Sequence, residues 1–332
     1  MAEPEGIVIG VDLGGTNVRA GAVSADGKLL SAQDAPIRAE DGPQAGVQRI
    51  GDLIEAVIAR LPHGQRPAAV GIGSTGPLDR RTGAIQNPHT LPGWEDVSVV
   101  RPLEARFGVP VALENDADAA ALGEAWAGAG RAVRRMVMVT VGTGVGTGIT
   151  LDGHIYRGLD DEHPEGGHLV VDPAGPPCYC GGRGCLESLV AGPAIARHAA
   201  QEPGLQNSAL WALCAGQPEN LTAGHVFEAA RMGDALGVQL TRRAARYLGL
   251  GLVSLVMTFL PDAIVFTGGV MHSFDLLEDD LRAILRQHSV IVPAERVQLR
   301  MAELGQWAGV IGAARAAQLL TSGYAFHGSI YQ

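Results

Sequence analysis

The sequence predicts an α/β protein built from two related halves, and three observations carry this prediction. The chain has 332 residues, enough for two domains that each bury a core. Apolar runs typical of strands alternate with segments of helical periodicity. The stretch Arg135–Ile155 repeats the order found in residues 6–29: an apolar strand, a Gly/Thr turn, a second strand and an Asp-Gly hairpin.

The first half begins with three strands and then alternates helices with strands. Strands are expected within residues 6–16, 17–27 and 28–37, where apolar runs are separated by glycine-containing turns. Helical spacing of Val47, Ile50 and Ile54 predicts the first helix. The elements expected up to residue 126 are a helix at 43–61, a strand at 68–76, a helix at 97–107, a strand at 109–115 and an alanine-rich helix to about 126.

The second half repeats this alternation with a larger share of helix. A pair of strands is expected at 135–155, and the later segments are mostly helical. The elements expected after the strand pair are a long helix at 234–260, a strand at 262–270, a helix at 274–287, a strand at 296–302 and a last helix at 309–320.

Charge and composition exclude several classes of function. A net charge of −10 argues against a nucleic-acid partner, because phosphate backbones are held by Lys and Arg, and it favours small molecules. Lys28 is the single lysine and lies in no Gly-rich loop, which argues against P-loop NTPases, protein kinases and pyridoxal enzymes. The N-terminus lacks the basic and apolar regions of a secretory signal, and the longest apolar run, Tyr247–Leu260, is too short for a membrane span. We therefore expect a cytoplasmic protein without a membrane partner.

Three glycine-rich turns are candidates for binding the phosphates of a nucleotide. Such turns expose successive N–H groups with no side chain in the way, although any one of them is also compatible with a simple tight hairpin. Asp12 ends the first strand beside one turn and is placed to hold Mg²⁺. The turn residues are Gly14, Gly15 and Thr16, then Gly142, Thr143 and Gly144, and finally Gly268 and Gly269.

Asp116 is the candidate general base for transfer of a phosphoryl group to a hydroxyl. It lies where the strand ending in Asn115 meets the alanine-rich helix, and such a transfer needs a carboxylate to orient the hydroxyl and accept its proton. The alternative is that Asn115, Asp116 or Asp118 caps the helix, because Asn and Asp are preferred there. The residues alone leave the two interpretations open.

The stretch Glu165–Glu187 holds one histidine and three cysteines at the spacing of a zinc site. Cys178 and Cys180 are too close for an easy disulfide, and no base is indicated that would activate a catalytic thiol. Three thiolates and an imidazole instead fit a closed tetrahedral zinc site, which leaves no position for substrate. The sequence therefore predicts structural Zn²⁺ on His168, Cys178, Cys180 and Cys185, whereas Cys214 is predicted to be a core thiol.

These motifs together resemble the ROK family of sugar kinases and sugar-responsive repressors. The matching stretches are "GVDLGGTNVRAG", "ENDADAAALGE", "VGTGVGTGI", "EGGH" and "CYCGGRGCLE", which occur in this order from about Gly6 to Ala314. The resemblance implies the actin-like ATPase fold, a duplicated ribonuclease H-like arrangement whose two domains close a cleft on sugar and ATP. It implies a small domain at 1–122, joined by the helix at about 309–322, and a large domain at 123–308 with the zinc loop at 168–185.

The resemblance also implies the roles of individual residues. It favours Asp116 as the base, and it implies the zinc ligands named above and Mg²⁺ bound with ATP. The sugar ligands that it implies are Gly76, Asn87, Asn115, Asp116, Glu165, His168 and Glu187. The family's oligomers imply a homodimer or homotetramer.

Glucose, phosphorylated at C6, is the expected sugar, because "EGGH" with "CYCGGRGCLES" looks most like the bacterial glucokinases of this family. Mannose, fructose, N-acetylglucosamine and N-acetylmannosamine stay open, although Pro77 and Leu78 replace the Gly and Arg of some N-acetylmannosamine kinases. A repressor is the less favoured class, because the first strand begins where a DNA-binding segment would lie.

Overall fold

The computed structural model describes residues 6–62, 65–87 and 90–322. The chain forms two compact units, one containing residues 1–134, 148–163 and 302–332 and the other containing residues 135–147 and 164–301. Compared with the small domain that the sequence predicted, the first unit also contains residues 123–134, 148–163 and 302–308. Within the described ranges, no helix is both long and apolar enough to cross a membrane.

A five-stranded sheet forms the centre of the first unit, with the strand order β3-β2-β1-β4-β8. The first three strands of the chain pair antiparallel, whereas β1 pairs parallel with β4 and β4 with β8. The predicted strands are confirmed as β1 (Val8–Leu13), β2 (Asn17–Val23), β3 (Leu29–Pro36), β4 (Val70–Ser74) and β8 (Val111–Asn115).

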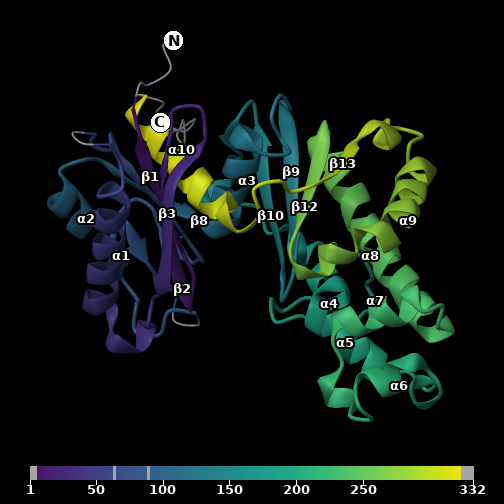
Figure 1. Cartoon of the computed structure of the whole chain (residues 1–332). Helices are drawn as coiled ribbons and strands as arrows, with labels where there is room; N and C mark the ends of the chain where they lie inside the picture. Colours follow the sequence, from purple (N-terminus) through teal and green to yellow (C-terminus); the bar gives the residue numbers. More distant parts are fainter. Residues whose placement is uncertain (1–5, 63–64, 88–89, 323–332) are drawn as a thin grey trace. The chain divides into compact units, whose positions relative to one another are not determined.

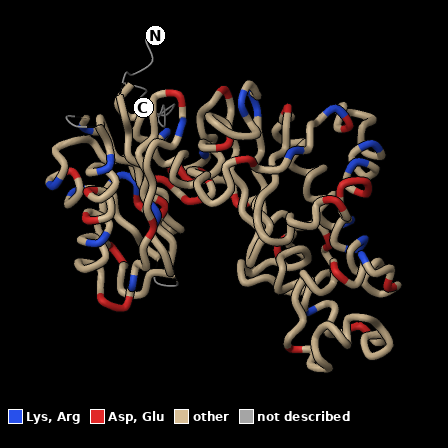
Figure 2. Tube along the Cα trace, in the orientation of Figure 1, with Lys and Arg blue, Asp and Glu red and all other residues tan. Residues whose placement is uncertain are grey.

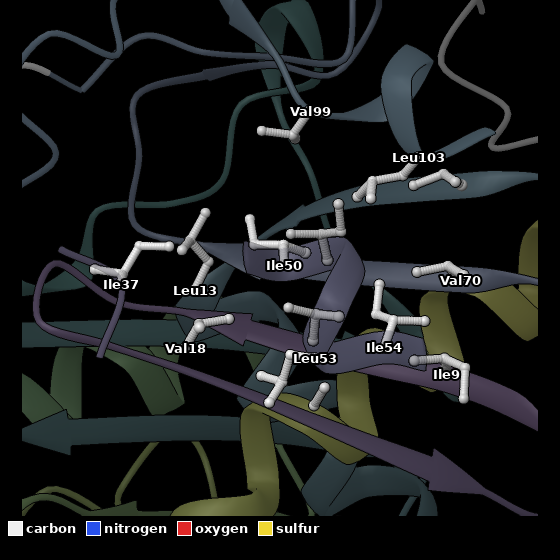
Figure 3. Packing of buried hydrophobic residues seen from close by; sticks show 14 of the residues in the cluster. Ile9, Leu13, Val18, Ile37, Ile50, Leu53, Ile54, Val70, Val99 and Leu103 are labelled. Atoms are coloured by element: carbon white, nitrogen blue, oxygen red, sulfur yellow. The ribbon is translucent and has the colours of Figure 1, made fainter. Parts of the chain in front are cut away.

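Two helices, α1 (Pro43–Ile58) and α2 (Val100–Phe107), cover one face of this sheet (Figure 1). Figure 3 shows the core between these helices and the sheet, which includes Ile50 and Ile54 of α1 and Ile9 of β1. The predicted helix at 97–107 is wrong in its first turn. Residues Val97–Ser98 form strand β7, which pairs with β6 (Ala84–Ile85) and through it with β5 (Leu78–Asp79) in a small sheet that the sequence did not predict.

The other face of the sheet is covered by α10 (Ala308–Thr321), which also packs against α3 (Asp116–Ala127). The backbones approach closely because glycines line the contact. A Cβ built on Gly71 of β4 would lie 1.8 Å from the carbonyl oxygen of Ala313, and one on Gly312 would lie 1.5 Å from that of Ala119. Helix α10, although it lies near the end of the described residues, is therefore an integral layer of the first unit.

A second five-stranded sheet has the order β11-β10-β9-β12-β13. When the strands of each sheet are numbered in chain order, both sheets have the spatial order third, second, first, fourth, fifth. This shared order confirms the predicted duplication. Strands β9, β12 and β13 pair parallel. The strands are β9 (Arg135–Val141), β10 (Val145–Leu151), β11 (His154–Ile155), β12 (Ala263–Thr267) and β13 (Gln298–Met301).

Helices make up most of residues 164–301 outside strands β12 and β13, as predicted. The long helix α8 begins after Asp234, whose carboxylate accepts the N–H of Gly237, and it packs against α4, α7 and α9. In α9, acidic residues gather in the first half and arginines in the second, the arrangement that the helix dipole favours (Figure 2). The helices are α4 (Leu186–Val190), α5 (Gly192–Ala200), α6 (Ala209–Leu213), α7 (Ala223–Arg231), α8 (Ala235–Phe259) and α9 (Phe274–Gln287).

Candidate functional site

The parallel strands of the first sheet end in one row, which gathers the candidate residues of this unit. Leu13 of β1 pairs with Ser74 of β4, and Ser74 pairs with Asn115 of β8. The turn at 14–16, the loop after Ser74 and the start of α3 therefore leave the sheet at the same edge. In α/β sheets, ligands bind outside the carboxyl ends of parallel strands.

The negative charge of Asp12, at this edge, is partly balanced by Arg19. Its Oδ2 accepts a hydrogen bond from Nη1 of Arg19 at 3.1 Å. Burial raises the pKa of Asp12, the charge of Asp116 raises it further, and Arg19 opposes both effects. Since two carboxylates influence each other here, a bound cation would stabilise their charged forms. Asp12 thus has the chemistry expected of a Mg²⁺ ligand.

The structure separates the roles of Asn115 and Asp116. Asn115 is the N-cap of α3, because its Oδ1 accepts the N–H groups of Ala117 and Asp118 at 2.8 and 3.3 Å. Asp116 is the first residue of the helix, and its Oδ2 accepts a hydrogen bond from the Thr75 hydroxyl at 3.0 Å. The capping task therefore falls to Asn115, and the Asp116 carboxylate is oriented by Thr75.

The loop around Gly76 is held by a buried amide. Asn87 is 2% exposed, and its Nδ2 donates to the carbonyl oxygen of Gly76 at 2.7 Å and to the Thr90 hydroxyl at 2.6 Å. Its Oδ1 accepts the N–H of Thr90 at 3.0 Å. A Cβ on Gly76 would lie 3.4 Å from Nδ2 of Asn115, so the two candidate sugar ligands are neighbours. Asn87 positions this loop through its internal hydrogen bonds.

A buried charged cluster beside this edge was missed by sequence reasoning. Glu114 is 2% exposed and accepts hydrogen bonds from Arg80, at 2.9 Å, and from Arg157. Asp118 is fully buried, and neither of its carboxylate oxygens has a hydrogen-bond partner among the described residues. Burial, followed by the charge of Glu114, raises the pKa of Asp118 to about 7, against the opposing effects of His163, Arg157 and Arg80. No local pattern predicts this cluster, because its members lie far apart in the chain.

As the pH rises from about 4 to 7, we expect the free energy of unfolding of the Asp118→Asn variant to increase relative to that of the wild type. The unfolded carboxyl ionises near pH 4, whereas the folded one stays protonated until about pH 7. The wild type therefore loses free energy of unfolding across this window, by up to roughly a few kcal/mol, and the asparagine variant does not. Urea unfolding of both proteins at pH 5 and pH 8 measures the effect. The prediction would be contradicted if their free energies of unfolding differed by the same amount at the two pH values.

The two glycine turns of the second unit lie side by side. Thr140 of β9 pairs with Thr267 of β12, so the turns that follow these strands are neighbours. Gly268 has a φ of +98°, and a Cβ there would lie 2.4 Å from the carbonyl oxygen of Val141. The carbonyl oxygen of Gly142 accepts the N–H of Gly192 at 2.7 Å. Turns of this kind present backbone N–H groups to an anion.

The four predicted zinc ligands come together. Their donor atoms all lie within 4.8 Å of one another. Cys180 Sγ is 3.6 Å from Cys185 Sγ, and Cys178 Sγ is 3.5 Å from His168 Nδ1. Tetrahedral zinc with ordinary bond lengths would separate two sulfurs by about 3.8 Å and a sulfur from a nitrogen by about 3.6 Å. The cluster therefore fits a tetrahedral metal ion, and Cys214 lies outside it as a buried thiol, as predicted.

The predicted sugar ligands His168 and Glu187 flank the loop that carries the His/Cys cluster. His168 turns Nδ1 to the thiols, and its Nε2 lies 3.2 Å from the hydroxyl of Tyr179. Glu187 Oε2 accepts the N–H of Val145 at 2.8 Å, next to the glycine turn. Partial desolvation of the Tyr179 hydroxyl, together with its hydrogen bond to Glu187 and the negative charges of Glu187 and Glu165, raises the pKa of Tyr179 to about 12. Sequence reasoning did not single out Tyr179, although its place between two cysteine ligands could have drawn attention to it.

Known proteins resemble this chain over nearly its whole length. A glucokinase of Thermotoga maritima is 36% identical over 307 residues, which cover 92% of this chain and 96% of that protein. A ROK hexokinase of Thermus thermophilus, known from a crystal structure, is 37% identical with a TM-score of 0.80 and covers 95% of this chain and 99% of its own. A ROK family glucokinase of Streptomyces griseus, crystallised with glucose and AMPPNP, is 34% identical with a TM-score of 0.72. The match covers 94% of this chain and 99% of that protein.

The fold expected from the resemblance is confirmed by these relatives. Two related α/β domains with the same strand order, as found in both sheets here, are the actin-like ATPase fold. The sequence model of the ROK family matches residues 8–319, nearly the whole chain. The protein therefore belongs to the ROK family.

Proposed function

We propose that this protein is an ATP-dependent glucokinase, which transfers the γ-phosphoryl group of ATP to the C6 hydroxyl of glucose. The relatives named above, two glucokinases and a hexokinase, support this activity. The observation that carries it is the Asp116 carboxylate, oriented by Thr75 at the strand edge that it shares with Asp12. A carboxylate so placed suits proton abstraction from a hydroxyl better than a purely structural role.

Asp116 acts as the general base in this proposal. It orients the C6 hydroxyl and accepts its proton as the new oxygen–phosphorus bond forms and the bond to the leaving ADP oxygen breaks. Phosphoryl transfer needs little covalent help, so positioning and charge compensation supply most of the rate. Mg²⁺, when bound with ATP, would neutralise charge on the phosphates, and Asp12 is the residue that would hold it.

The glycine turns are the proposed phosphate ligands. Because the chain has one lysine, outside any such turn, the proposal assigns this work to backbone N–H groups and hydroxyls. The neighbouring positions of the two turns in the second unit support a shared role. The residues assigned to ATP are Asp12, Gly14, Gly15, Thr16, Gly142, Thr143, Gly144, Gly268 and Gly269.

The sugar hydroxyls are assigned to amide, carboxylate and imidazole groups. Carboxylates and imidazole exchange hydrogen bonds with hydroxyls and reject analogues that leave them unpaired. Asn115 would use its Nδ2, since Oδ1 caps α3. The residues assigned to glucose are Gly76, Asn87, Asn115, Asp116, Glu165, His168 and Glu187, with Asn87 acting through the loop of Gly76.

Zinc has a structural role in this proposal. His168, Cys178, Cys180 and Cys185 would use all four positions of the ion, so it positions His168 and the neighbouring Glu187 and takes no part in the chemistry. We also propose a homodimer or homotetramer as the working form, as in other members of the family.

A sugar panel tests the proposal. ADP release is measured with Mg-ATP and glucose, mannose, fructose, N-acetylglucosamine or N-acetylmannosamine, and the product is identified by its phosphorylated carbon. We expect the highest kcat/KM for glucose, with phosphate at C6. A higher kcat/KM for another sugar would correct the substrate, and no turnover on any of the five with folded, zinc-loaded protein would overturn the kinase assignment.

A further inference from the structure

The hydroxyl of Tyr179 lies among the three residues of the second unit that are assigned to the sugar. His168 Nε2 is 3.2 Å from the Tyr179 hydroxyl oxygen, and the two rings meet edge to face with centroids 5.1 Å apart. Glu187 is a hydrogen-bond partner of the same hydroxyl, and Glu165 is close enough to act on it electrostatically. The Tyr179 hydroxyl oxygen therefore interacts with all three of these residues.

The direction of these hydrogen bonds is fixed by the chemistry of the site. Nδ1 of His168 faces the thiols, where it would bind zinc, so Nε2 carries the proton of the neutral ring. Nε2 then donates to the Tyr179 oxygen, and the Tyr179 hydroxyl donates to the Glu187 carboxylate. A sugar hydroxyl bound to the same pair would accept from His168 and donate to Glu187 in the same way. The phenol therefore reproduces the hydrogen bonds of a sugar hydroxyl.

We propose that the Tyr179 hydroxyl occupies the place of a sugar hydroxyl on His168 and Glu187, and that the sugar must displace it to bind. The inference rests on the proposed function, because it takes the sugar ligands from there. Tyr179 is thereby a determinant of sugar affinity. Its hydroxyl satisfies the polar groups of the site before the sugar binds, so the sugar must make hydrogen bonds that are stronger than those it displaces.

Tyr179, rather than its partners, is the group free to move. Its side chain is 82% exposed, so little packing holds the ring in place. Glu187 is held from its other side by the N–H of Val145 at 2.8 Å, and Gly144 fits only because it has no side chain, since a Cβ there would lie 2.6 Å from Glu187 Oε2. His168 is held by the thiol cluster. A ligand that enters this group would therefore rotate the tyrosine away and leave the other residues in position.

The test is Tyr179→Phe, which keeps the ring and removes the competing hydroxyl. Glucose binding is measured by calorimetry without ATP, KM and kcat by the coupled assay, and zinc by metal analysis. We expect glucose affinity to rise and KM to fall by about three- to tenfold, the net worth of one ordinary hydrogen bond, with kcat unchanged within about twofold. Zinc content should equal that of the wild type.

Tyr247→Phe is the matched control. It removes a phenol hydroxyl that donates to a carboxylate within residues 168–185, that of Asp172, at 2.9 Å. We expect it to leave the glucose KM at the wild-type value. An unchanged or higher KM in Tyr179→Phe, or an equal decrease in both variants, would overturn the inference while wild-type turnover upholds the proposed function. A wild type that neither binds nor phosphorylates glucose would overturn both.

Discussion

Replacing Asp116 by asparagine is expected to lower kcat for glucose by about a thousandfold, the usual contribution of a positioned general base. Asparagine has nearly the same shape and can still accept the hydrogen bond from Thr75, which the Asp116 carboxylate accepts at 3.0 Å. It has no basic oxygen for the C6 proton, however. Since ground-state contacts are largely kept, glucose affinity should change far less than kcat. Steady-state kinetics and calorimetric glucose binding on the same preparation separate these two quantities.

Asp118→Asn is the matched control for this experiment. It makes the same chemical change two residues further along α3, at a side chain that is fully buried beside Glu114. We expect kcat close to the wild-type value at pH 8, together with the stability change described above. A thousandfold loss in both variants would point to a disturbed helix, and wild-type turnover in Asp116→Asn would exclude Asp116 as the base.

Replacing Cys180 by serine is expected to remove most of the bound zinc and to weaken glucose binding by about tenfold or more. Cys180 is the exposed member of the cluster, so the substitution costs little packing, and its effect comes from the lost ligand. Without the ion, His168 is no longer fixed with Nε2 toward its partners, and losing one such hydrogen bond costs about tenfold in affinity. Metal analysis and glucose calorimetry are the measurements.

Cys214→Ala serves as the control for the cysteine variant. Cys214 is a buried thiol outside the cluster, so its removal should leave both zinc content and glucose affinity unchanged. Full glucose binding by zinc-free Cys180→Ser protein would refute the positional role of the metal.

The sequence predicted the parts of the fold and site that depend on local or repeated pattern. The repeat of strand, turn and strand was sufficient to expect the duplication that the two equal strand orders confirm. The spacing of His168 and the three cysteines predicted the cluster, because four ligands of one ion must lie within a few ångströms of one another. The resemblance to the ROK family supplied the fold name and the choice among sugars.

Features that depend on contacts between distant residues could not be predicted. The Glu114 carboxylate meets Arg80 and Arg157, which lie 34 and 43 residues away, and only the folded chain brings them together. Asn115 and Asp116 are both good capping residues, so only backbone geometry decides which one caps α3. The short strands β5, β6 and β7 carry too few residues for a periodicity to show.

The close packing of α10 on β4 and α3 sets the order of events during synthesis. The sheet of the first unit is complete once residue 115 has been made, yet the helix that covers its second face is translated only at residues 308–321. Ribosomes add roughly 5–20 residues per second, so the synthesis of α10 follows that of the sheet by on the order of ten seconds or longer. During this time the apolar face of the sheet is uncovered. The first unit is therefore finished only after most of the second has been made, and until then the nascent protein offers chaperones an uncovered sheet.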